Sequence, residues 1–224
     1  MDIFLILIWY IVFLLSTTFH EASHAFAAKL GGDPTASNGG QVSLDPLPHI
    51  KREPLGMVVF PLIFLFTNGF PMGWASTPYN PFWARENHRK AALMALAGPG
   101  ANLILVIISG IILKIGISYH WFNGSQVMES AYGNSSYDLP AFVKILSITF
   151  FLNFILFIFN LLPLPGFDGS NAITGVMKKS TAISYMNAIS NPGLAFLSIF
   201  IAWQIFPYIF EPAIRFAWKV IFLL

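Results

Sequence analysis

The stretch Leu14–Leu30, LLSTTFHEASHAFAAKL, extends an uncharged apolar run that begins at Ile3 and carries two histidines and a glutamate. A helix needs about 20 apolar residues to cross a membrane, and this run is long enough. Each ionisable residue at the centre of a span costs about 2.5–3.5 kcal/mol on insertion scales. His20, Glu21 and His24 therefore need a compensating interaction, and a bound metal ion would supply one.

The composition of the 224-residue chain is that of a membrane protein. It is 56% hydrophobic and only 10% charged, whereas soluble domains carry about 25% charged residues. The net charge of +2 does not favour a nucleic-acid partner, and the absence of cysteine excludes disulfides and thiolate metal sites. The first run has neither a basic start nor a small-residue cleavage site, so we expect a retained helix.

Four more apolar segments follow the first. They are Leu55–Pro78, Ala91–Leu113, Ile145–Leu164 and Leu194–Phe206. The predicted fold class is an all-α polytopic membrane protein of about four to five transmembrane helices, with a re-entrant, β-hairpin-like segment between the first and second core helices. We expect one membrane-embedded domain over residues 1–224, with a core at 3–175 and a C-terminal helical region at 180–224. In the polar segment 33–53, Gln41–Leu44 could form a short strand.

The re-entrant assignment concerns Leu55–Pro78, which prolines and glycines interrupt. If this segment crossed the membrane simply, His24 and Asp168 would lie on opposite sides. If it enters and returns on one side, eight basic residues share that side: Lys29, Lys51, Arg52, Arg85, Arg89, Lys90, Lys178 and Lys179. Only Lys114 and Lys144 then face the other side, whereas simple crossings divide the ten residues equally. The positive-inside rule makes the larger group cytoplasmic.

The motif HEASH carries the chemistry. Positions i and i+4 of a helix lie on one face, about 5–6 Å apart at their Cβ atoms, so His20 and His24 can bind one zinc ion at about 2.0–2.1 Å. Glu21 projects beside such a metal, where it can take a proton from a water whose pKa zinc lowers from about 15.7 to 7. The alternative is a packed histidine pair with Glu21 reaching the surface, and the cost of three buried ionisable groups disfavours it.

Two histidines leave a zinc ion short of ligands, and a hydrolytic site needs a third. The remaining histidines read as loop or interfacial residues: His49, His88 and His120. Asp168 lies in the stretch FNLLPLPGFDGSN, Phe159–Asn171, which ends the last clean span; its prolines stop the helix and Gly169 permits a tight turn. On spacing alone Asp168 could equally be a metal ligand or the N-cap of the residues that follow it.

Three motifs in this order resemble the site-2 protease family of intramembrane zinc metalloproteases. They are HEASH, AGPGAN at Ala97–Asn102 and NLLPLPGFDG at Asn160–Gly169. LDPLPHI at Leu44–Ile50 and GWASTPYNP at Gly73–Pro81 also resemble segments of its compact bacterial and archaeal members, which lack a PDZ domain. The resemblance covers roughly residues 10–175. Many relatives have glycine where this chain has serine inside HEASH, a change that spares every reacting group.

The resemblance implies one Zn²⁺ per chain and a set of site residues. The implied zinc ligands are His20, His24 and Asp168. Glu21 would be the general base, Asn160 would polarise the scissile carbonyl or hold substrate near the metal, and Asn102 would line the site. Asn153 shares a helix face with Asn160, and for it we favour a hydrogen bond between helices.

The implied function is that of a zinc metalloendopeptidase which cleaves membrane proteins within or near their transmembrane segments, as in regulated intramembrane proteolysis. The expected partners are a transmembrane protein or peptide substrate and the lipid bilayer, in a prokaryotic inner membrane with the active site near the cytoplasmic side. The alternative is a zinc-binding membrane protein without proteolysis, either a metal carrier or an inactive relative that binds a partner. A carrier would have ligands along a path through the bilayer, whereas the ionisable residues here converge on one layer.

Overall fold

A computed structural model describes residues 3–132 and 139–222. The chain is helical and contains no strand within these residues. In this described part, four helices are long and apolar enough to cross a membrane, which confirms the predicted all-α polytopic class. They are α1 (Ile3–Gly31), α6 (His88–Ser118), α8 (Ala141–Asn160) and α11 (Pro192–Phe222).

The shorter elements connect these four helices. They are α2 (Thr35–Asn38), α3 (Leu47–Arg52), the π-helical turn η1 (Leu55–Val59), α4 (Phe60–Asn68), α5 (Pro81–Glu86), α7 (Gly124–Ala131), α9 (Asp168–Ala172), the 3₁₀ turn η2 (Ile173–Val176) and α10 (Lys179–Ile189). The strand considered at Gln41–Leu44 is not formed, and these residues make bends instead. A strand needs a hydrogen-bonded neighbour, and the described part of the chain offers none.

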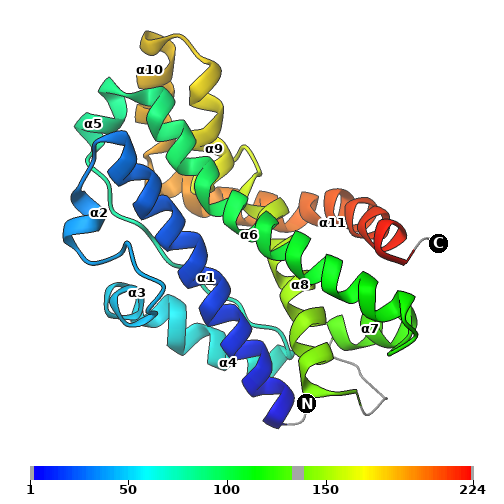
Figure 1. Ribbon diagram of the computed structural model, residues 1–224. Helices are drawn as coiled ribbons and strands as arrows, with labels where there is room; N and C mark the ends of the chain where they lie inside the picture. The colour runs from blue at the N-terminus through cyan, green and yellow to red at the C-terminus, as the bar shows by residue number, and fades with distance from the viewer. Residues whose placement is uncertain (1–2, 133–138, 223–224) are drawn as a thin grey trace.

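The segment between α1 and α6 also differs from the β-hairpin-like form that we predicted. Its first half is helical in η1 and α4, and Gly69, with a φ of 73°, ends α4. Residues 70–80 are then extended and return beside α1 to α5 (Figure 1). The hairpin-like form is wrong because the returning chain has no second strand to pair with among the described residues. Passage into a bilayer and back stays a prediction.

The helices α1, α6 and α8 lie against one another and form the core, and the long helix α11 packs across α6 and α8 (Figure 1). Aromatic side chains join α8 to α11, as where the Phe150 and Trp218 ring centroids lie 4.8 Å apart. Helix α11 is longer than the predicted span because it continues through Pro207 and Pro212. Transmembrane helices tolerate internal proline where neighbouring groups satisfy the freed backbone.

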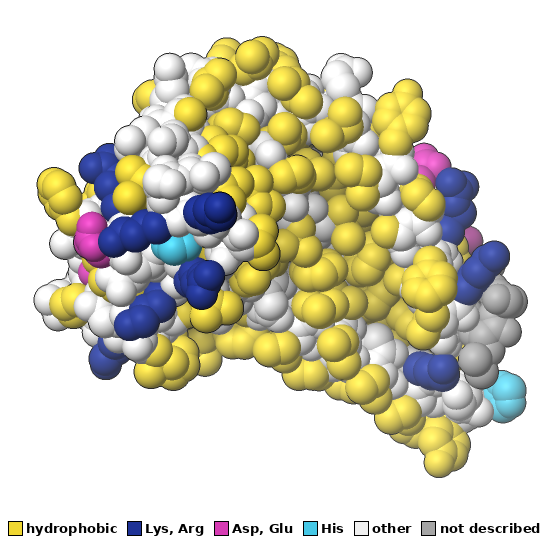
Figure 2. All heavy atoms as spheres, turned by 90° about the horizontal axis from the view of Figure 1, so that it is seen from above, with side chains coloured by type: hydrophobic (Ala, Val, Ile, Leu, Met, Phe, Trp, Pro, Cys, Tyr) yellow, Lys and Arg dark blue, Asp and Glu magenta, His cyan; other side chains and the backbone are white. Residues whose placement is uncertain are grey.

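Charged side chains gather at the two ends of the molecule, with mostly hydrophobic surface between them (Figure 2). At one end the last turn of α1, helix α5 and the first turns of α6 and α10 meet. Lys90 Nζ donates to the Gly31 carbonyl oxygen at 3.2 Å, and Lys179 pairs with Glu86 at 2.6 Å. This arrangement is typical of a multi-pass membrane protein.

Candidate active site

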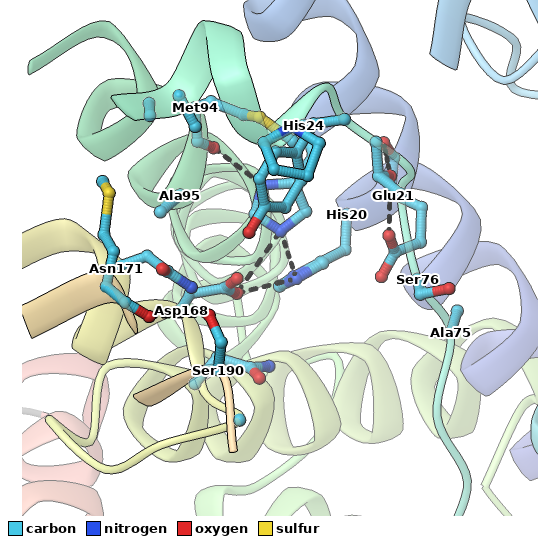
Figure 3. A pocket seen from close by; sticks show the side chains of 18 of the residues that line it. His20, Glu21, His24, Ala75, Ser76, Met94, Ala95, Asp168, Asn171 and Ser190 are labelled. Carbon is cyan, nitrogen blue, oxygen red and sulfur yellow. Dashed lines mark hydrogen bonds and ion pairs between the residues drawn. The ribbon is translucent and has the colours of Figure 1, made fainter. Parts of the chain in front are cut away.

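His20, His24 and Asp168 converge although 148 residues separate the first from the last (Figure 3). The Nε2 atoms of the two histidines are 3.0 Å apart, and Asp168 Oδ2 lies 3.1 Å from one and 3.3 Å from the other. All the donor atoms fall within 4.8 Å of one another, and both histidines are buried. Asp168 is the first residue of α9 and not its N-cap, because Phe167 occupies the cap position.

The hydrogen bonds of both histidines leave their Nε2 atoms free to bind a metal. His24 Nδ1 donates to the Met94 carbonyl oxygen at 2.7 Å, and His20 Nδ1 lies 2.5 Å from Asn102 Oδ1. A neutral imidazole carries one hydrogen, so both Nε2 atoms present lone pairs to the same space. Two lone pairs and a carboxylate oxygen repel one another unless a proton or a metal cation lies between them. This donor set of two imidazoles and one carboxylate fits Zn²⁺.

A tight turn after α8 brings Asp168 to α1. Pro163 and Pro165 lack backbone N–H groups, and Gly166 adopts a φ of 91°, so the chain reverses directly after α8 ends. A Cβ at Gly169 would overlap the Leu161 and Leu162 carbonyl oxygens. The glycine therefore lets the start of α9 lie against the end of α8.

Gly98 of the AGPGAN motif allows α6 to approach the two histidines. A Cβ at this position would overlap Nε2 of both His20 and His24. Gly100, two residues later, has no atom within 4 Å of its Cβ position. The first glycine is thus required by the site, and the second is not.

Glu21 lies in the wall of a cavity of about 300 Å³ that also contains the three converging residues. Its side chain is only 5% exposed, and Thr77 holds it. The Thr77 hydroxyl lies 2.7 Å from Glu21 Oε2 and 2.9 Å from the Glu21 carbonyl oxygen. The carboxylate therefore faces the cavity in an orientation set by the extended segment.

The extended segment is anchored on both sides of Thr77. Arg52 donates to Ser76, the Ser76 hydroxyl donates to Glu53, and the Asn80 N–H donates to Asp33 Oδ2 at 2.7 Å. Burial raises the pKa of Asp33, but hydrogen bonds from Thr35 and Asn80 outweigh it and hold that pKa below its ordinary value. The segment thus has a defined position along the cavity.

The structure separates the predicted polar residues into three groups. Asn160 lines the cavity, and its amide donates one hydrogen to the Leu156 carbonyl oxygen, which leaves a second available. Asn102 is fully buried behind His20 instead of lining the cavity. Asn153 donates to Ser16 of α1 and accepts from Asn102 of α6, which confirms the predicted bond between helices.

The other histidines lie apart from the cluster. His49 is 1% exposed and bonds the Ser43 carbonyl oxygen, His88 bonds the Met177 carbonyl oxygen, and His120 has a left-handed backbone with a φ of 57°. No role for Gly98 or Thr77 was predicted from the sequence. Gly98 stands inside a quoted motif and could have been found there, whereas nothing local to Thr77 indicates its contact with Glu21.

Comparison with known proteins bears on this site. The model of Peptidase family M50 matches residues 8–200. "Putative zinc metalloprotease YwhC" of Bacillus subtilis (strain 168) is 32% identical over 192 residues, which cover 85% of this chain and 78% of that protein. Two proteins named "Putative zinc metalloprotease Rip2" are also similar. The one from Mycolicibacterium smegmatis is 26% identical over 71% of this chain, and the one from Mycobacterium tuberculosis is 29% identical over 75%.

The chain spans about half the length of the Rip2 proteins, 53% and 56% respectively. No solved structure matches it.

Proposed function

Because this chain belongs to peptidase family M50, a family of metalloproteases, we propose that it is a zinc endopeptidase that cleaves membrane proteins within or near their transmembrane segments. The observation that carries the proposal is the convergence of two imidazole lone pairs and a carboxylate beside Glu21 in one cavity. All of these groups belong to helices, or follow helices, that are apolar enough to span a membrane.

His20, His24 and Asp168 would hold the metal, which acts when bound as a Lewis acid that acidifies water and polarises a carbonyl group. Glu21 takes the proton from the attacking water and later passes it to the leaving amine. The free amide hydrogen of Asn160 donates to the carbonyl oxygen as negative charge develops there, a contribution of about 2.7–4 kcal/mol in other hydrolases. No covalent bond forms between enzyme and substrate.

The site also supports a position near the cytoplasmic side. His24 stands seven residues before the end of α1 at Gly31, which corresponds to roughly 10 Å at the α-helical rise. That end of α1 carries the larger group of basic side chains (Figure 2), and basic ends face the cytoplasm. Water would thus reach the cavity from the cytoplasm, and α4 with residues 70–80 would form the re-entrant segment.

The extended segment is the proposed binding surface for the substrate backbone. Within the described residues, the N–H and C=O groups of Ala75 and Thr77 have no hydrogen-bond partner. These alternate residues point their backbone groups to one side of an extended chain, and both line the cavity. A locally unwound substrate could add to them as a strand.

We expect Ala75→Pro to abolish or strongly reduce cleavage, because proline removes one of the two free N–H groups that a bound strand would use. Ala75→Gly keeps the N–H and should retain most of the activity. Initial cleavage rates of a model transmembrane substrate by the two purified variants provide the measurement. Equal rates for Ala75→Pro and the wild type would exclude strand addition at this residue.

We also expect Thr77→Val to slow cleavage. A hydrogen bond to a charged group contributes about 1.5–3 kcal/mol, so kcat should fall roughly ten- to 150-fold with little change in KM. Thr77→Ser keeps the hydroxyl and should restore most of the rate. If valine and serine variants behaved alike, Thr77 would act through packing and not by orienting Glu21.

Metal analysis with a cleavage assay tests the proposed function itself. We expect the wild type to contain about one zinc per chain and to cleave the model substrate, and Asp168→Asn to lose most of both, because an amide is a weaker zinc ligand than a carboxylate. Zinc uptake into vesicles without any peptide cleavage would instead favour a metal carrier. A zinc-free, inactive wild type would overturn the proposal.

A further inference from the structure

Two buried asparagines connect His20 to a backbone carbonyl group on a third helix. His20 Nδ1 lies 2.5 Å from Asn102 Oδ1 on α6, and Asn102 Nδ2 donates to Asn153 Oδ1 on α8 at 2.8 Å. Asn153 Nδ2 donates in turn to the Thr149 carbonyl oxygen and to Ser16 Oγ, each at 2.8 Å. One continuous chain of hydrogen bonds therefore joins α1, α6 and α8.

The direction of every bond in this chain follows from its last member. A backbone carbonyl oxygen only accepts, so Asn153 must turn its NH₂ group to Thr149 and its oxygen to Asn102. Asn102 must then present its own NH₂ group to Asn153 and its oxygen to His20. Only a hydrogen on Nδ1 satisfies that oxygen, and a neutral His20 then has its lone pair on Nε2.

Burial prevents this order from being reversed. Asn102 and Asn153 are each 0% exposed and Ser16 is 2% exposed, so water does not compete for their amide groups. Turning Asn102 over would set its oxygen against Asn153 Oδ1, so that two acceptors face each other; its NH₂ group could then pair only with the other tautomer of His20, which carries its hydrogen on Nε2. An unpaired polar group of this kind costs about 1–3 kcal/mol when buried.

We propose that Asn102 and Asn153 are positioning residues that set the tautomer of His20, so that Nε2 presents its lone pair to the metal ion. His24 reaches the same state directly, because the Met94 carbonyl oxygen accepts from its Nδ1. His20 Nδ1 has no direct carbonyl partner within the described residues. It is linked to the Thr149 carbonyl oxygen through the amides of Asn102 and Asn153. The inference rests on the proposed function, since it requires His20 to be a metal ligand.

Nitrogen NMR of the full-length, metal-free protein with ¹⁵N-labelled histidine tests the tautomer without any activity assay. We expect His20, assigned by its loss in His20→Gln, to carry its hydrogen on Nδ1 in the wild type. In Asn153→Leu, which removes the amide at similar size and leaves His20 and Asn102 intact, the two tautomers should become mixed. A wild-type His20 with its hydrogen on Nε2 would overturn the proposed role of this hydrogen-bond chain, the relay from Thr149 through Asn153 and Asn102 to His20.

Zinc affinity, measured by competition with a chelator, provides the second readout. Removing a hydrogen-bond partner of a metal ligand typically lowers metal affinity about 10–100-fold. We expect a loss of this size from Asn153→Leu, although Asn153 does not contact a proposed ligand. Asn102→Leu should lower the zinc affinity by the same factor. The double variant Asn102→Leu/Asn153→Leu should lower it no further, because the two hydrogen bonds act in series. Ser147→Ala removes a buried hydroxyl that bonds only its own helix α8 and should leave the affinity unchanged.

Unchanged affinity in Asn153→Leu, or losses that multiply in the double variant, would overturn the relay while the proposed zinc site stands. If the wild type and His20→Gln bound zinc equally weakly, the proposed function would fail instead. The tautomer of His20 in the wild type would then still decide the relay.

Discussion

Glu21→Gln should abolish peptide cleavage while the protein keeps its zinc. Glu21 lies in the cavity wall beside the proposed ligands, and Thr77 orients its carboxylate. Glutamine preserves the size of the side chain and can still pair with Thr77, but it cannot take a proton from water. General base catalysis contributes about 10²–10⁴-fold to rates, so the cleavage rate of a model transmembrane substrate should fall at least that far.

Zinc content distinguishes a lost base from a damaged site. The variant should bind about one zinc per chain, the same content that we expect of the wild type, because Glu21 is not among the three converging donors. Glu53→Gln is a matched control: Glu53 also accepts a hydroxyl hydrogen from the extended segment, but it does not line the cavity. Substantial cleavage by Glu21→Gln would show that another group accepts the proton.

Gly98→Ala should remove metal binding, the second large effect that we expect. The added Cβ would overlap Nε2 of both His20 and His24, so α6 must move away or the two rings must turn. Overpacking in a core costs about 1–3 kcal/mol, and here the displaced atoms are the ligand atoms themselves. Zinc affinity should therefore fall by at least the roughly 10–100-fold seen when groups that support a ligand are removed.

Gly100→Ala in the same motif provides the control, because its Cβ would meet no atom within 4 Å. It adds the same methyl group to the same helix and should leave zinc affinity near that of the wild type. Zinc titration of both variants, together with their helix content by circular dichroism, makes the comparison. Similar affinities for the two alanine variants would contradict the close approach of α6 to the histidines.

Local patterns predicted much of this molecule. The apolar run from Ile3 to Leu30 predicted a helix with nearly the bounds of α1, and the i, i+4 spacing placed His20 and His24 on one face. The prediction was wrong where an outcome depended on distant neighbours. A strand could not form at Gln41–Leu44 or in a hairpin because no partner strand lies within the described residues. The candidate span Leu194–Phe206 lies inside the longer helix α11, which continues through Pro207 and Pro212.

The candidate site was likewise predicted only in part from local patterns. The spacing within HEASH indicated His20 and His24 as candidate metal ligands and Glu21 as a candidate base, because such chemistry depends on the kind of group and on short spacings. For Asp168 the spacing left ligand and N-cap open, and only the resemblance to a known family implied a ligand. Only the folded chain brings Asp168 to His20, 148 positions earlier, and to His24. Only it shows that Gly98 makes room, that Thr77 orients Glu21, and that Asn102 stands behind His20 instead of facing the cavity. These features follow from how α1, α6 and α8 pack, and contacts between distant residues leave no period or spacing in the sequence.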